Sequence, residues 1–193
     1  LRQSDIQVEN AAVTARILSA NNKPLIPQTK IISVHTSPPL HGIVYWFNQK
    51  SINLFGEHLI KTIAWKEGKE ITITQGTELV KNFWNKKIGI DPSSMNIYDG
   101  SGLSPANRIT TMAMARILQS LKKEIWFDSY FNSLPQYNNM KMKSGTISDV
   151  IAYAGYHTSV SGTPMVFSFM INNYNGSSSA IRQKMFRVLN TLK

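Results

Sequence analysis

Three stretches near the end of the chain alternate apolar and polar residues with a period of two, which is typical of β-strands that bury one face. They are residues 140–146, 150–158 and 164–172. The first two are separated by a turn at Ser148-Asp149 and the last two by a turn at residues 160–163, and such short connections join antiparallel strands. The sequence therefore predicts an antiparallel meander.

Most of the rest of the chain has helical spacing of its apolar residues. We predict helices over residues 42–50, 51–65, 77–88, 110–124, 126–134 and 177–193. Ser51 and Thr77 are predicted at helix N-termini, where their side chains can accept a backbone N–H, and Gly89 is predicted at a helix end. The segment 90–109, rich in Asp, Ser, Gly and Pro, is predicted as a long shaped loop.

The first 36 residues have a different pattern. Residues 12–18 and 30–36 are rich in β-formers and flank a polar, proline-containing loop, which predicts a β-hairpin. We therefore expect an α+β chain with a hairpin-like lead-in over residues 1–36, a mainly helical part over 37–139, and a sheet with a C-terminal helix over 140–193.

The composition is that of a globular protein, with 42% hydrophobic, 10% aromatic and 17% charged residues. The absence of cysteine excludes disulfides, thiolate metal sites and thiol catalysis. The four histidines have no metal-ligand spacing, so we expect neither a metal nor a cofactor. No apolar run approaches the roughly 20 residues of a membrane helix, and no signal peptide is recognisable.

A formal charge of +10 favours anionic partners. The basic residues are scattered, however, and no arginine-rich stripe or RNA-binding motif accompanies them. We expect no nucleic-acid partner, and keep a basic nucleic-acid-binding domain as an alternative.

Chemistry is indicated by two short motifs. Lys143-Ser144-Gly145-Thr146 lies on the first predicted strand, where a cation, a hydroxyl and a backbone amide can face a ligand. Ser51 and Asn53 form a Ser-x-Asn element 92 positions before Lys143, at the predicted start of a helix. Ser-x-Asn followed by Lys-Ser/Thr-Gly is the ordered pair of serine β-lactamases and penicillin-binding proteins, which act by acyl transfer.

With these motifs, the chain resembles the class C low-molecular-mass penicillin-binding proteins, which are D-alanyl-D-alanine carboxypeptidases and endopeptidases. Four blocks carry the resemblance: residues 37–59 (SPPL running into Ser-x-Asn), 98–110 (YDGSGLSPANRIT), 142–162 (MKSGT and the next strand) and 164–174. The Asp-Gly-Ser-Gly-Leu-Ser block is the most specific, and it disfavours a β-lactamase. The resemblance implies a serine β-lactamase/transpeptidase-like fold.

The family's nucleophile motif, Ser-x-x-Lys, should precede Ser-x-Asn, and residues 1–50 contain none. The literal match at Ser120–Lys123 lies near a predicted helix C-terminus, which is the wrong end for a nucleophile. The resemblance therefore implies the C-terminal half of the domain. A sheet of three strands would have an unpaired edge, so we expect a missing N-terminal half, a homodimer, or marginal stability.

The resemblance also implies roles for the site residues. Ser51 would relay a proton, Asn53 would bind the substrate amide, and Lys143 would supply positive charge. Ser144 would bind the terminal carboxylate, beside Gly145, and the Thr146 amide would stabilise the oxyanion. The implied partners are peptidoglycan D-Ala-D-Ala peptides and β-lactams, in a periplasmic or other extracytoplasmic setting. A non-catalytic cell-wall peptide-binding or scaffolding module is the alternative.

Overall fold

The computed structural model describes residues 13–25, 31 and 33–193, and the chain divides into two units, residues 1–37 and 38–193. In the first unit, α1 (Ala15–Ala20) begins after Thr14, whose hydroxyl accepts a hydrogen bond from the Ile17 N–H at 3.2 Å. The predicted strand over residues 12–18 is therefore wrong, because a threonine cap and the helix-forming Ala, Arg and Leu outweigh the β-branched residues.

The second predicted strand of the lead-in, residues 30–36, lies partly outside the described residues. Ile31 and residues 33–36 belong to no helix or strand. The described residues of the lead-in thus contain no hairpin.

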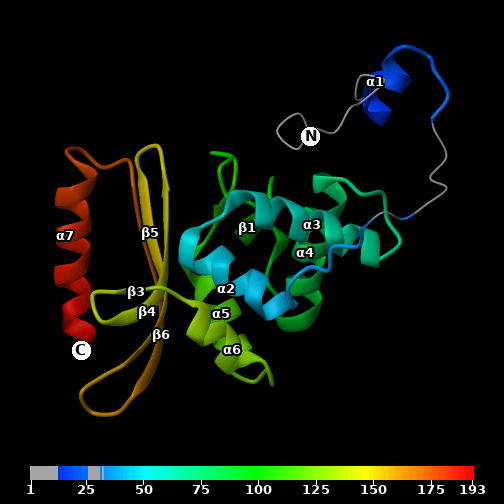
Figure 1. Cartoon of the computed structure of the whole chain (residues 1–193). Helices are drawn as coiled ribbons and strands as arrows, with labels where there is room; N and C mark the ends of the chain where they lie inside the picture. Colours follow the sequence, from blue (N-terminus) through cyan, green and yellow to red (C-terminus); the bar gives the residue numbers. More distant parts are fainter. Residues whose placement is uncertain (1–12, 26–30, 32) are drawn as a thin grey trace, which may run out of the picture. The chain divides into compact units, whose positions relative to one another are not determined.

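The second unit alternates helices with a small and a larger sheet (Figure 1). In chain order it contains α2 (Leu40–Lys50), α3 (Asn53–Lys66), α4 (Ile73–Ile88), the 3-10 helix η2 (Pro92–Ser94), β1 (Met95–Asn96), β2 (Arg108–Ile109), α5 (Thr111–Leu121), α6 (Phe127–Ser133), β3 (Gln136–Tyr137), β4 (Met140–Ile147), β5 (Val150–Thr158), β6 (Pro164–Asn172), α7 (Ser178–Leu189) and the 3-10 helix η3 (Asn190–Leu192). The α+β class and the predicted meander are confirmed.

The larger sheet has the order β3-β4-β5-β6, with every neighbouring pair antiparallel. The short strand β3 was not predicted. It pairs only with Met140 and Lys141 at the beginning of β4, across a turn formed by Asn138 and Asn139 with positive φ angles. The outer edge of β4 after Met142 therefore faces no other strand of the described residues.

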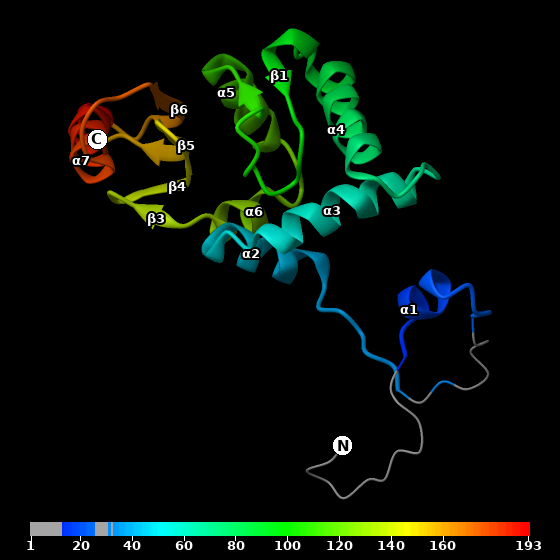
Figure 2. The same ribbon diagram turned by 90° about the horizontal axis from the view of Figure 1, so that it is seen from above.

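Helices cover both faces of this sheet (Figures 1 and 2). On one face, α7 packs on a core of buried residues from β4, β5, β6 and α7: Met140, Met142, Ile151, Tyr153, Phe167, Ile181, Met185 and Leu189. On the other face, Tyr156 packs with Leu118 and Leu121 of α5 and with Leu134 after α6. The Tyr156 hydroxyl donates to the Leu118 carbonyl at 2.8 Å, which ties α5 to the middle of the sheet.

The helix predicted over residues 77–88 begins earlier than expected. The Thr72 hydroxyl accepts a hydrogen bond from the Gln75 N–H at 3.2 Å, so Thr72 and not Thr77 caps α4. Gly76 therefore lies within the first turn of α4, although glycine usually weakens a helix. Here the missing side chain has a packing function, because a Cβ atom at Gly76 would lie 2.2 Å from the Ile60 carbonyl oxygen of α3.

This close helix contact gives a test. Gly76→Ala should lower the free energy of unfolding by more than about 2 kcal/mol, because the methyl group would push α3 away from α4. Gly42→Ala is the matched control. Its Cβ would meet nothing closer than Pro38 at 3.9 Å, so the variant should be as stable as the wild type or up to about 1 kcal/mol more stable. Equal stabilities of the two variants in urea denaturation would contradict the α3–α4 contact.

Candidate active site

Ser51 lies in the sharp connection between α2 and α3. It follows the last residue of α2 and has φ 53° and ψ 48°, in the left-handed region, while Ile52 stands before the first residue of α3. The prediction that Ser51 caps the second helix is therefore wrong. A left-handed conformation at a residue with a Cβ costs roughly 1–2 kcal/mol, and such positions concentrate at functional sites.

Side chains near the end of α2 hold this connection beside the sheet. The amides of Asn48 and Gln49 donate to the hydroxyl and carbonyl of Ser133, at 2.7 and 2.9 Å. Ser133 is buried at the end of α6, just before the chain enters the sheet. Lys141 of β4 donates to the neighbouring Leu134 carbonyl at 3.1 Å. The end of α2 is thus fixed relative to the beginning of β4.

Lys143 of β4 reaches Ser51 across this junction. Its Nζ donates to Ser51 Oγ at 2.9 Å and to the Ser144 carbonyl oxygen at 3.2 Å. Partial burial lowers the pKa of Lys143, because an ammonium loses hydration there. Two groups that are 92 positions apart in the sequence therefore meet in one place.

Asn53 does not join this pair in the described structure. It is the first residue of α3 and is exposed, and within the described ranges its side chain makes no hydrogen bond. It lies two residues after Ser51 and so remains close to the Ser51–Lys143 pair in the chain.

The outer edge of β4 offers unpaired backbone groups next to Lys143. The Met142 N–H donates to the Pro135 carbonyl at 3.0 Å, away from β5. Since N–H groups alternate in direction along a strand, the amides of Ser144 and Thr146 point to the same outer edge. No strand of the described residues covers them there. The Thr146 amide therefore faces the open edge.

The side chains of β4 alternate between the two faces of the sheet. Lys141 and Lys143 are on the face of α6 and Ser51, whereas Met142 packs under α7 and Thr146 contacts α7 through Arg182. The period of two places the Ser144 side chain on the α7 face. A ligand that lies along the outer edge can still reach both faces. Gly145, with nothing within 4 Å of a built Cβ, leaves the Lys143 face open.

The Asp-Gly-Ser-Gly-Leu-Ser block forms a turn organised by Asp99. This carboxylate accepts hydrogen bonds from the N–H groups of Gly102 and Ser104 and from the Asn107 amide. Partial burial alone would raise the pKa of Asp99, but the hydrogen bonds from Ser104, Asn107, Gly102 and Ser101 outweigh it and hold the pKa below its ordinary value.

This turn rests directly on α3, the helix that follows Ser51. A Cβ at Gly56 would lie 2.2 Å from the Gly100 carbonyl oxygen, and Glu57 Oε1 accepts the Ser101 N–H at 3.0 Å. The second oxygen of Glu57 is buried without a hydrogen-bond partner in the described part of the chain. Glu57 thus attaches the turn to α3.

Ser120 of the literal Ser-x-x-Lys match lies in the last turn of α5 and donates to the Ile117 carbonyl. It is at the helix end that we considered unsuitable for a nucleophile. Among the described residues, no group of three or more His, Asp or Glu is placed to hold a metal ion, and no helix is both long and apolar enough to cross a bilayer.

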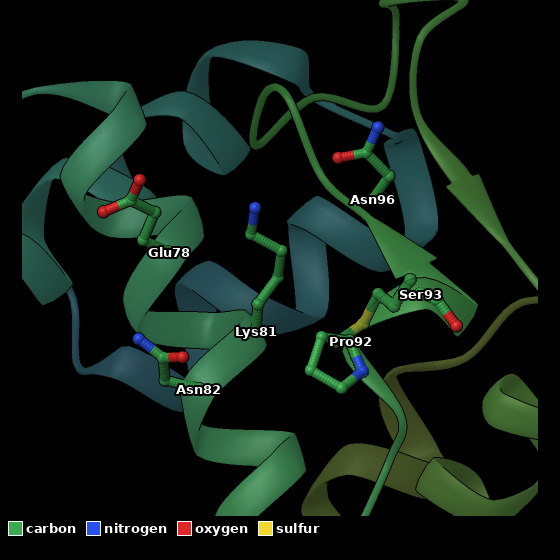
Figure 3. Close-up of a pocket in the computed structure, with 7 residues that line it drawn as sticks. Glu78, Lys81, Asn82, Pro92, Ser93 and Asn96 are labelled. Carbon is green, nitrogen blue, oxygen red and sulfur yellow. The ribbon is translucent and has the colours of Figure 1, made fainter.

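A polar hollow of about 470 Å³ opens between α4 and the η2–β1 segment (Figure 3). Figure 3 shows Lys81 extending from α4 into this space, with Glu78 and Asn82 on the same helix and Asn96 opposite. Its lining residues are Glu78, Lys81, Asn82, Pro92, Ser93, Met95 and Asn96. None of the sequence-predicted site residues contributes to it.

Comparison with known proteins agrees with the motifs. Residues 3–136 and 136–192 match the family described as D-Ala-D-Ala carboxypeptidase 3 (S13). The chain belongs to this family. The resemblance inferred from the sequence is thereby confirmed.

Two curated relatives are named D-alanyl-D-alanine carboxypeptidases. The chain is 27% identical over 178 residues to D-alanyl-D-alanine carboxypeptidase DacB of Haemophilus influenzae, with 80% of this chain and 37% of the relative covered. It is 27% identical over 168 residues to a D-alanyl-D-alanine carboxypeptidase of an Actinomadura species, with 76% of this chain and 31% of that protein covered. The chain thus spans about a third of the length of these relatives.

Solved structures show the same fold. Penicillin binding protein 4 (dacB) from Haemophilus influenzae superposes with a TM-score of 0.72 at 22% identity, over 82% of this chain and 40% of that one. Its complex with a β-lactam gives a TM-score of 0.75 at 23% identity, over 88% and 45%. The penicillin-binding-protein fold predicted from the sequence is confirmed for the part that this chain covers.

The residues that hold Ser51 beside β4 were missed by sequence reasoning. Asn48, Gln49 and Ser133 form ordinary side-chain hydrogen bonds whose partners are more than 80 positions apart, and no local pattern indicates them. The close contact between Gly56 and Gly100 could not be predicted either, because no sequence pattern indicates that a glycine within a helix packs against another glycine.

The Asp99 turn predicts a pH dependence of stability. A carboxylate with a lowered pKa stabilises the fold above its unfolded pKa of about 3.9, and this contribution disappears as the pH falls through the lower, folded value. Asp99→Asn should therefore be less stable than the wild type near pH 6, and the difference should shrink below about pH 4. Urea denaturation between pH 3 and pH 7 measures this difference.

Asp149→Asn provides the control, because Asp149 lies in the β4–β5 turn and its side chain makes no hydrogen bond in the described structure. This variant should follow the wild type at every pH. A constant difference for Asp99→Asn across the whole range would show that its carboxylate charge does not hold the turn.

Proposed function

We propose that this chain supplies the Ser-x-Asn and Lys-Ser-Gly half of the active site of a serine D-Ala-D-Ala carboxypeptidase or endopeptidase. The observation that carries the proposal is the 2.9 Å hydrogen bond between Lys143 Nζ and Ser51 Oγ beside an open strand edge. The family assignment supports the reaction class, since acyl transfer needs a cation, a hydroxyl and an amide donor at one place.

The attacking serine and its lysine base come from a Ser-x-x-Lys segment outside this sequence. The serine attacks the peptide bond before a terminal D-alanine, and water then hydrolyses the acyl-enzyme. Ser51 relays a proton to the leaving amine, and Lys143 holds that hydroxyl by a hydrogen bond from its Nζ. Asn53, exposed beside Ser51, binds the amide of the substrate.

The strand edge holds the peptide. An extended peptide pairs with the outer edge of β4, as an added strand does. The Thr146 amide donates to the developing oxyanion, Gly145 leaves room for the ligand, and the Ser144 hydroxyl binds the terminal carboxylate. The substrate is a peptidoglycan stem peptide, with β-lactams as substrate mimics, and the site of action is periplasmic or otherwise extracytoplasmic.

Exposed apolar side chains on α2 and α3 indicate that a further chain segment covers these two helices. α2 has no buried residue, and several large apolar side chains of α2 and α3 are open to solvent: Leu40 (62%), Tyr45 (41%), Trp46 (51%) and Leu54 (63%). So much exposed apolar surface marks a surface that another chain segment covers. The N-terminal half of the domain, which carries the nucleophile, is the occupant we propose, with a homodimer as the alternative.

Benzylpenicillin tests where the nucleophile lies. The 193-residue chain should form no covalent adduct in intact-mass spectrometry, whereas a longer protein that joins it to a Ser-x-x-Lys segment should gain one penicilloyl group.

In the longer protein, Ser51→Ala should slow hydrolysis of a D-Ala-D-Ala peptide by about 10²- to 10⁴-fold, the usual contribution of a proton-transfer residue.

Ser120→Ala is the control and should leave acylation unchanged, because Ser120 lies at the end of α5. A penicilloyl adduct on the short chain would contradict the proposal that the nucleophile lies outside it. A chain that binds stem peptides but never supports hydrolysis would instead be a non-catalytic cell-wall peptide-binding module.

A further inference from the structure

A second hollow, of about 420 Å³, opens at the end of the larger sheet where β4 begins. The pairing of β4 with β5 stops at Tyr156, but β5 continues to Thr158, which pairs with Pro164 of β6. The end of β5 and the beginning of β6 therefore extend past β4. Phe127 and Phe131 of α6 line the hollow together with these strand ends. None of the proposed catalytic or substrate-binding residues lines it.

Part of the lining of this hollow is aromatic and fixed in place. The ring centroid of Tyr156 lies 5.2 Å from that of Phe127 and 5.8 Å from that of Phe131, and the rings meet edge to face. The Tyr156 hydroxyl already donates to the Leu118 carbonyl, so this polar group needs no further partner. Met165 of β6 adds a thioether side chain that adapts to the shape of what it contacts. This lining suits the apolar body of a ligand.

Two lysines make the hollow positively charged. Lys122, the first residue after α5, and Lys141 of β4 both line it, and no Asp or Glu of the described residues does so. Lys141 donates one N–H to the Leu134 carbonyl at 3.1 Å, which leaves two of its three donors available. Within the described ranges, the Lys122 ammonium makes no ion pair and no hydrogen bond. Both lysines are partly buried, and charges attract more strongly where water is partly excluded.

We propose that this hollow binds a soluble amphiphilic anion, a carboxylate or phosphate attached to an apolar chain or ring. The apolar part lies against Phe127, Phe131 and Met165, and the anionic group lies at Lys122 and Lys141. Ligand pockets of proteins commonly occupy about 300 to 1,000 Å³ and combine apolar walls with a few polar groups, as this hollow does. The inference goes beyond the proposed function and does not depend on it, because binding here needs neither the nucleophile nor hydrolysis.

Methyl NMR of the 193-residue chain tests this proposal with octanoate as the probe. The Met165 methyl signal should shift as octanoate is added, whereas that of Met112, 68% exposed at the other end of α5, should not. Octan-1-ol has the same chain without the charge and should bind about 10-fold more weakly. Acetate has the charge without the chain and should cause no shift at the same concentrations.

Lys122→Gln should weaken octanoate binding about 10-fold, the usual effect of losing a hydrogen bond to a charged group, and should change octan-1-ol binding less than about 2-fold. Lys123→Gln is the matched control. It removes the same charge from the next residue, which is exposed and does not line the hollow, so the binding of both probes should stay unchanged.

The absence of a Met165 shift with octanoate, equal affinities for octanoate and octan-1-ol, or equal effects of the two lysine variants would overturn the proposal. A shift that disappears in the longer protein with its Ser-x-x-Lys segment would also overturn it, because the added segment would then fill the hollow. Retention of the chain by phosphatidylglycerol vesicles without any shift by octanoate would indicate a membrane contact instead of a site for a soluble anion.

Discussion

The site depends on the outer edge of β4, which beyond Lys141 pairs with no other strand in the described part of the chain. A β3 strand long enough to pair with Ser144 and Thr146 would hide their amides, and a register shifted by one residue would move Lys143 to the α7 face. The short strand β3 pairs with Met140 and Lys141 and then stops. The beginning of β4 is therefore covered by β3, whereas the backbone groups of Ser144 and Thr146 are free to pair with a peptide.

Two features at this edge are unfavourable for stability. Lys143 is a partly buried cation, and Ser51, to which it donates a hydrogen bond, has a left-handed backbone. Each costs free energy that ordinary packing would avoid. Such costs gathered in one region are expected of a functional site, and they are offset by the cores under α7 and around Tyr156.

The sequence predicted the parts of this fold that depend on local patterns. The period-two strands, the helix ended by Gly89 and the terminal helix that begins after Ser177 were confirmed, as was the family from its motifs. Prediction failed where distant contacts decide the structure. Gly76 continues a helix because Ile60 packs against it, and Ser51 adopts its turn while Asn48 and Gln49 are tied to Ser133. In the lead-in, the cap at Thr14 was overlooked in favour of β-branched residues.

The most direct test of the central claim is the titration of the Lys143 ammonium, because the claim is that Ser51 and Lys143 form one partly buried pair. NMR detection of the Lys143 side chain, assigned by its loss in Lys143→Met, should give a pKa below the ordinary lysine value of about 10.4, and its signals should change in Ser51→Ala. A Lys143 that titrates like an exposed lysine and does not respond to Ser51→Ala would contradict the account.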